Sequence, residues 1–105
     1  MKIIETTMFT KKLKSLLSDE EYRHLQNELI SNSEKGKVIP GSGGLRKMRW
    51  EISGRGKSGG VRIIYYWIKI KEIILMLLIY PKNEQDNLTP SQLKILKSIV
   101  EKELK

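Results

Sequence analysis

Apolar and polar residues follow two different periods along this chain, and the change of period divides it into elements. Residues 2–6 alternate weakly, which predicts a short strand. Apolar residues then recur at helical spacing from Phe9 to Leu17, which predicts a first helix. A second helix is expected to begin at Asp19, because Ser18 and Glu21 have the spacing of a capping box.

The second half of the chain reads as three strands and a helix. Leu45–Ile52 alternates between apolar and basic residues, and Val61–Lys69 is rich in β-branched and aromatic residues. Ile73–Tyr80 is continuously apolar, which is typical of a strand covered on both faces. Thr89 and Gln92 form a capping box for the last helix. The predicted order is β-α-α-β-β-β-α, an α+β fold with helices packed on an antiparallel sheet.

Length and composition narrow the class of protein. The chain has 105 residues and no internal repeat, so we expect one domain over residues 1–105. It has no cysteine, and His24 is its only histidine, so we expect no metal site and no cofactor. No secretory signal is visible, and the apolar run at 73–80 is too short to span a bilayer. A cytoplasmic protein without a membrane partner is expected.

The positive charge is concentrated in one segment. The net charge of the chain is +8, and residues 35–62 hold eight basic residues and one acidic residue, a net charge of +7. Scattered lysines would be enough for solubility, whereas a concentrated field attracts polyanions such as nucleic acid. We therefore expect a binding surface for nucleic acid in this segment.

Alternation predicts which basic side chains meet. Lys47 and Arg49 are two residues apart on one strand, so they share a face. Pairing with the next strand can bring Arg62 beside them, and Lys82 can reach the same area from the end of the third strand. The expected result is a cluster of arginine and lysine on an open face of the sheet.

Such a cluster suits the chemistry of phosphate. Arginine holds a phosphodiester with two donors, and a lysine crowded by other cations can act as a general base. RNA supplies its own nucleophile in the 2′-hydroxyl, so the protein needs only to orient it, remove its proton and stabilise the charged phosphorane. The residues alone leave two interpretations open: cleavage of RNA, or plain binding of its backbone.

Three motifs point to a known family. The stretches "GGLRKMRW", "GKSGGVRIIYYW" and "LLIYPKNEQDNLTPSQ", in this element order, resemble the RelE/HigB toxins of bacterial toxin–antitoxin systems. The resemblance implies a microbial-RNase-like fold and an endoribonuclease that cuts messenger RNA in the ribosomal A site without a metal ion. It also implies a cognate antitoxin with a helix-turn-helix domain, through which alone the toxin would reach operator DNA.

The resemblance also assigns roles to residues. The catalytic positions fall on Lys47, Arg49, Arg62 and Lys82. RelE itself also has a tyrosine in its C-terminal region, and this chain reads "NEQDNLTP" there, so Lys47 and Lys82 become the candidates for the general base. Contacts with RNA are expected from further residues of the basic hairpin and its neighbours: Arg46, Arg55, Lys57, Tyr66 and Tyr80.

Two other functions remain as alternatives on the same fold. One is a non-enzymatic inhibitor of DNA gyrase, like the ParE toxins, and the other is a non-toxic RNA-binding module. The nuclease hypothesis predicts that Arg62→Ala damages cleavage most. It also predicts little change in stability, on the premise that Arg62 faces solvent.

Overall fold

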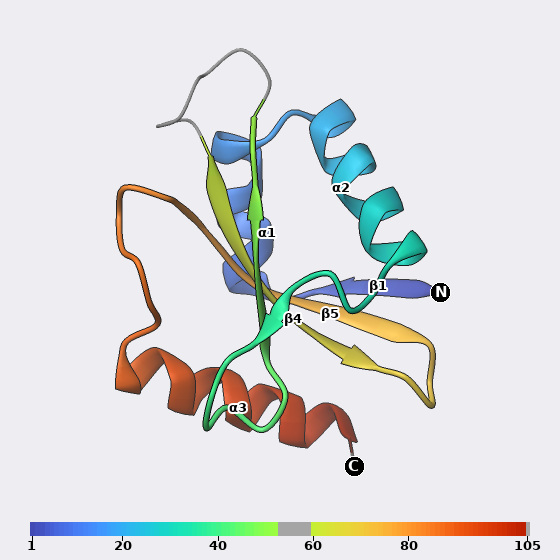
Figure 1. The fold of residues 1–105 in the computed structure, drawn as a ribbon, viewed down its shortest axis with the longest axis vertical. Coiled ribbons are helices and arrows are strands. Elements are labelled where there is room, and N and C mark those ends of the chain that lie inside the picture. The colour runs from blue at the N-terminus through green and yellow to red at the C-terminus, as the bar shows by residue number, and fades with distance from the viewer. Residues whose placement is uncertain (53–59, 105) are drawn as a thin grey trace.

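The computed structural model describes residues 1–52 and 60–104 of the chain. Its elements, in order, are β1 (Lys2–Glu5), α1 (Thr7–Leu16), α2 (Asp19–Ser31), β2 (Lys37–Val38), β3 (Arg46–Trp50), β4 (Val61–Ile68), β5 (Ile73–Pro81) and α3 (Pro90–Leu104). Figure 1 shows them arranged as helices around a twisted sheet. The α+β class and the predicted order of the longer elements are confirmed. The two-residue strand β2 is an addition that no periodicity could signal.

Local side chains fix where the helices begin. The hydroxyl of Thr6 accepts a backbone N–H from the first turn of α1 at 3.0 Å. Ser18 and Glu21 exchange hydrogen bonds of 2.9 and 3.1 Å at the start of α2, and Thr89 and Gln92 do the same at 3.0 and 3.1 Å before α3. Both predicted capping boxes are therefore confirmed, and each satisfies donors that the helix leaves free.

The strands form one sheet in the order β1-β5-β4-β3-β2. The pairs β3–β4 and β4–β5 are antiparallel, as predicted, and so is the pairing of the additional strand β2 with β3, but β1 runs parallel to β5. The expectation of a wholly antiparallel sheet was therefore wrong at this edge. The physical reason is that α1 and α2 carry the chain away from β1, so β1 is not tied to its neighbour by a hairpin. Among the described residues, no helix is long and apolar enough to cross a membrane.

The sheet separates two apolar clusters. On one face, Phe9 of α1 and Leu25 and Leu29 of α2 pack against strand residues that include Ile63. On the other face, α3 packs against strand residues that include Ile64 (Figure 1). Strand β5 contributes side chains to both clusters, which explains why its sequence is apolar without alternation. We call these faces the α1/α2 face and the α3 face.

One irregularity in β5 changes the direction of its last side chains. Ile64 pairs with Leu78 but Tyr65 pairs with Met76, so Leu77 is an extra residue in β5. Leu77 and Leu78 both belong to the cluster on the α3 face. Because this bulge breaks the alternation, Tyr80 lies on the α3 face, opposite to the face that counting by twos from Met76 would give.

Candidate nucleic-acid interface

A row of three polar side chains crosses the α3 face near the ends of the central strands. The register pairs Arg49 of β3 with Arg62 of β4, and Arg62 with Tyr80 of β5. Directly paired residues have Cβ atoms about 5 Å apart and point to the same face. The two guanidinium groups and the phenol are therefore neighbours, which confirms the predicted meeting of Arg49 and Arg62.

Two lysines extend this row toward the edge of the sheet. Lys47 lies two residues from Arg49 on β3, and it is paired with Lys37 of β2. Together with Lys35 and Met48, these three side chains line a concavity of about 520 Å³. We use the name basic row for Arg49, Arg62 and Lys47 together with Lys37. The positive charge of the hairpin thus continues onto a strand that the sequence did not reveal.

Lys82 follows the last residue of β5 and lies beside the start of β4. Its backbone N–H donates to the carbonyl oxygen of Gly60 at 3.0 Å, so it lies one residue beyond the end of β5 and beside the start of β4. Arg62 follows Gly60 by two positions. The backbone of Lys82 therefore lies near the part of β4 that carries Arg62.

Arg62 is buried, which corrects the premise that it faces solvent. It exposes only 6% of its surface. Its guanidinium has no hydrogen-bond or ion-pair partner within residues 1–52 and 60–104. A buried charge without an acceptor is costly, and Arg49 opposite adds a like charge. The open face expected from the sequence is therefore partly enclosed at Arg62.

The segment from Asn83 to Thr89 joins β5 to α3 and closes over one side of the basic row. The ammonium group of Lys47 donates to the backbone oxygen of Asp86 at 3.3 Å and to Oδ1 of Asn87 at 3.0 Å. Leu88 packs against the apolar cluster that contains Tyr80. The segment therefore supplies two oxygen acceptors to Lys47, one residue of the basic row.

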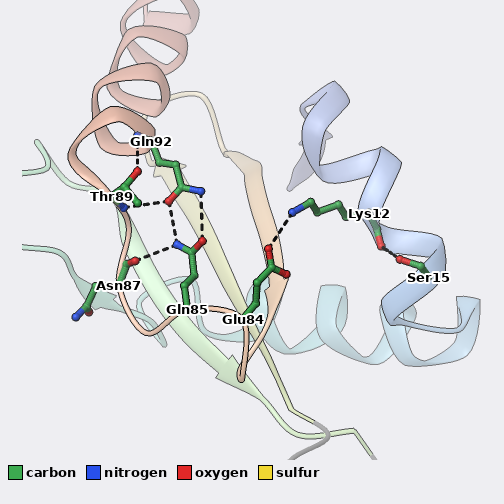
Figure 2. Close-up of polar contacts among 7 residues, drawn as sticks. All are labelled: Lys12, Ser15, Glu84, Gln85, Asn87, Thr89 and Gln92. Carbon is green, nitrogen blue, oxygen red and sulfur yellow. Dashed lines mark hydrogen bonds and ion pairs between the residues drawn. The ribbon is translucent and has the colours of Figure 1, made fainter.

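This segment is fixed at both of its ends (Figure 2). Glu84 forms an ion pair with Lys12 of α1 at 3.6 Å, and both side chains are about half exposed. The amide of Gln85 donates to Gln92 of α3 and to the backbone oxygen of Asn87, both at 2.9 Å. Exposed contacts of this kind contribute little each, so the segment is held by a few weak interactions together with the packing of Leu88.

Tyr80 is buried on the α3 face, beside Arg62. It exposes 1% of its surface, and its hydroxyl has no hydrogen-bond partner in the described part of the chain. Burial raises the pKa of Tyr80, the charge of Arg62 lowers it, and the carboxylate of Asp86 raises it again. The net pKa is raised, so the phenol keeps its proton and can act as a donor.

The structure does not bring all of the predicted RNA-binding residues together. Arg46 lies on the α1/α2 face, where its guanidinium donates to the backbone oxygens of Glu34 at 3.2 Å and Gly36 at 2.8 Å. Tyr66 shares the α3 face but packs against the cluster under α3. Arg55 and Lys57 lie outside the described residues. Arg46 thus links the end of α2 to β3 and is not part of the basic row.

Sequence reasoning missed Lys37 and the acceptors of the segment after β5. Lys37 belongs to a strand of two residues, which is too short to show a period. Asp86 and Asn87 meet Lys47 only through the fold, because 39 and 40 positions separate them from it in the sequence. For Arg46 a signal was present: it alternates with Met48, which is buried on the α1/α2 face.

The comparisons with known proteins agree with this architecture. A family model described as the RelE toxin of the RelE/RelB toxin–antitoxin system matches residues 1–105. The isolated RelE toxin of E. coli has a similar fold, with a TM-score of 0.58 at 16% identity over 93% of this chain and 97% of that one. A mutant of E. coli RelE in the free state gives a TM-score of 0.57 at 15% identity over 81% and 86%. The chain belongs to the RelE family, the toxins of toxin–antitoxin systems.

Proposed function

We propose that this protein is the toxin of a toxin–antitoxin pair and that it cleaves messenger RNA in the ribosomal A site. The observation that carries the proposal is the guanidinium of Arg62, which is buried beside Arg49 without an acceptor among the described residues. An anion bound there would satisfy both guanidinium groups. A phosphodiester fits, because arginine binds its oxygens through two parallel hydrogen bonds.

The reaction needs only groups that the chain and the RNA supply. The 2′-oxygen attacks the neighbouring phosphorus, and the bond from phosphorus to the 5′-oxygen breaks. The proton of the 2′-hydroxyl passes to a basic side chain, and the leaving 5′-oxygen takes up a proton. The products are a 2′,3′-cyclic phosphate and a 5′-hydroxyl, and no metal ion takes part.

Each residue of the site has a distinct task in this proposal. Arg62 and Arg49 hold the scissile phosphate and stabilise the negative charge that develops on the phosphorane. Lys47 and Lys82 are the candidates for the general base. Lys37 extends the positive surface on β2, where it can hold a phosphate next to the one that is cleaved.

Two partners follow from the proposal. The ribosome presents the messenger RNA, and an antitoxin keeps the toxin inactive. The antitoxin covers or distorts the basic row, and we expect it to contribute acidic side chains because its target is strongly positive. It also carries the DNA-binding domain of the pair.

The test is cleavage of messenger RNA on programmed ribosomes with EDTA present, followed by mapping of the new RNA ends. Arg62→Lys keeps the charge but loses the planar fork, and we expect the rate to fall on the order of a hundredfold. Arg23→Ala, on the exposed surface of α2, is the matched control and should cut at the wild-type rate. Growth arrest without new 5′-hydroxyl ends would instead support the non-enzymatic alternative.

A further inference from the structure

Two buried tyrosines differ in how their hydroxyl groups are satisfied. The hydroxyl of Tyr65 donates to the backbone oxygen of Ser33 at 2.8 Å and accepts the N–H of Gly36 at 2.8 Å. The hydroxyl of Tyr80 is equally enclosed and has neither a donor nor an acceptor in the described part of the chain. Nearly all buried hydroxyl groups are hydrogen-bonded in folded proteins, so this one calls for an explanation.

The position of Tyr80 supplies one. It is the direct partner of Arg62 across β4 and β5, and Arg62 has no acceptor within residues 1–52 and 60–104. The buried hydroxyl of Tyr80 is therefore a donor without an acceptor directly beside a guanidinium, and one anion can accept from both groups. The β5 bulge at Leu77 contributes to this arrangement, because it turns Tyr80 toward Arg62.

We propose that Tyr80 is a further phosphate-binding residue of the site. Its hydroxyl donates a hydrogen bond to a non-bridging oxygen of the phosphate that Arg62 holds. The identity of that phosphate as RNA rests on the proposed function. Binding of phosphate itself does not.

Tyr80 acts here as a donor and not as a base. Burial raises the pKa of Tyr80, so the phenol stays protonated at neutral pH. A protonated phenol can donate to a phosphate oxygen but cannot take the proton of the 2′-hydroxyl. The general base therefore remains one of the lysines.

The segment from Asn83 to Thr89 lies beside the site, because Leu88 packs on the cluster that contains Tyr80. In this proposal the segment shifts when phosphate binds. The hydrogen bonds from Lys47 to Asp86 and Asn87 are exposed, so a phosphate can replace these oxygens at the same ammonium group. The ammonium group of Lys47 thus exchanges the oxygens of Asp86 and Asn87 for oxygens of the phosphate. The remaining anchors at Glu84 and Gln85 can stay in place.

The experiment compares Tyr80→Phe with Tyr65→Phe, which removes a hydroxyl of the same kind from a satisfied site. Thermal melting of each purified variant is followed with and without inorganic phosphate. Arg62→Met is the control that lacks the proposed phosphate-binding guanidinium. We expect Tyr80→Phe to melt at or above the wild-type temperature and to bind phosphate roughly tenfold more weakly, the effect of losing one hydrogen bond to a charged group. Tyr65→Phe should melt lower and bind phosphate like the wild type.

Three results would overturn the inference. One is a melting temperature of Tyr80→Phe as low as that of Tyr65→Phe, which would show that its hydroxyl has an acceptor in the protein. Another is phosphate binding by Tyr80→Phe equal to that of the wild type. The third is a wild-type protein that phosphate does not stabilise more than it stabilises Arg62→Met.

Cleavage on programmed ribosomes separates this inference from the proposed function. A fall in kcat/KM for Tyr80→Phe of about the same factor, with the fold intact, would support both. If the wild type binds phosphate through Arg62 and Tyr80 but cuts no RNA, the proposed function fails and the assignment of Tyr80 stands.

Discussion

Each face of the sheet carries a buried tyrosine and an arginine, but their hydrogen bonding differs. The α1/α2 face has Tyr65 and Arg46, and the α3 face has Tyr80 and Arg62. On the first face these two side chains find backbone partners: Tyr65 bonds to Ser33 and Gly36, and Arg46 bonds to Glu34 and Gly36. On the second face the hydroxyl of Tyr80 is buried without a partner in the described part of the chain, and it lies beside Arg62, which exposes 6% of its surface. We infer that the first pair stabilises the fold, whereas the second pair lowers its stability and keeps donors available for a ligand.

This difference has a physical meaning. A satisfied polar network specifies one structure, because every alternative leaves donors unpaired. An unsatisfied one persists where a ligand completes it, and functional sites are where such exceptions concentrate. The following predictions test the contrast between the two faces.

The largest effect is expected from Arg62→Met compared with Arg46→Met. Arg62→Met should lower the cleavage rate on the order of a hundredfold or more, because the donor that stabilises the developing charge is lost. It should also raise the melting temperature, since an apolar side chain of similar size replaces a buried charge. Arg46→Met should do the reverse, with a lower melting temperature and an unchanged rate for the folded protein.

Ribosomal cleavage and thermal melting of both variants provide the measurement. An Arg62→Met protein that is less stable than the wild type would show that Arg62 is satisfied, and it would remove the contrast between the faces.

The next effect concerns stability on the α1/α2 face. Tyr65→Phe leaves the N–H of Gly36 and the oxygen of Ser33 buried without their partner. We expect a loss of about 1–3 kcal/mol in the free energy of unfolding. Urea denaturation measures it, and Tyr80→Phe is the control that should lose nothing. Equal losses in the two variants would contradict the comparison.

A smaller effect is expected where the segment after β5 meets Lys47. Asn87→Ala removes the Oδ1 acceptor at 3.0 Å, so Lys47 is more available to a phosphate. We expect binding of a short oligoribonucleotide to strengthen about two- to fivefold, the value of one exposed hydrogen bond. Asn83→Ala, on the exposed start of the same segment, should leave binding unchanged. Weaker binding by Asn87→Ala would show that Asn87 itself contacts the RNA.

The smallest effect lies in the alkaline range. The pKa values of Tyr22, Tyr65 and Tyr80 are all raised above 10.0, mainly by burial. Their phenols therefore ionise first in the unfolded chain, so this part of the stability is full below about pH 10 and is lost as the pH rises further. Urea unfolding between about pH 9 and pH 11 should show the decline.

Phenolate absorbance of these three residues should then appear only as the protein unfolds. Tyr80→Phe should reduce the decline, because it removes one of the ionising groups. Early ionisation of all tyrosines in the folded protein would contradict the burial on both faces.

Much of the fold was predictable from local patterns. Ser18 with Glu21 and Thr89 with Gln92 mark helix starts because a capping box involves residues only three positions apart. The alternation of β3 and β4 placed Lys47, Arg49 and Arg62 on one face for a similar reason. The placement of Arg46 among RNA-binding residues ignored this same alternation.

The rest of the site depends on contacts between distant parts of the chain. The burial of Arg62 arises from the packing around it and not from its own strand, so the sequence gives no measure of it. Strand β2 is recognisable only because Lys37 and Val38 pair with β3. The parallel pairing of β1 with β5 likewise depends on the path that the chain takes through α1 and α2 before it re-enters the sheet.

The sequence by itself determined the elements, the basic character of the hairpin and the shared face of its cations, because periodicity and capping act within a few residues. Tertiary structure decided that Tyr80 joins that face, since the bulge at Leu77 exists only in the pairing of β5 with β4. It also decided that Asp86 and Asn87 reach Lys47. These features follow from the register of the strands and from the path of the connecting segment after β5. Both are set by the packing of whole elements on the sheet.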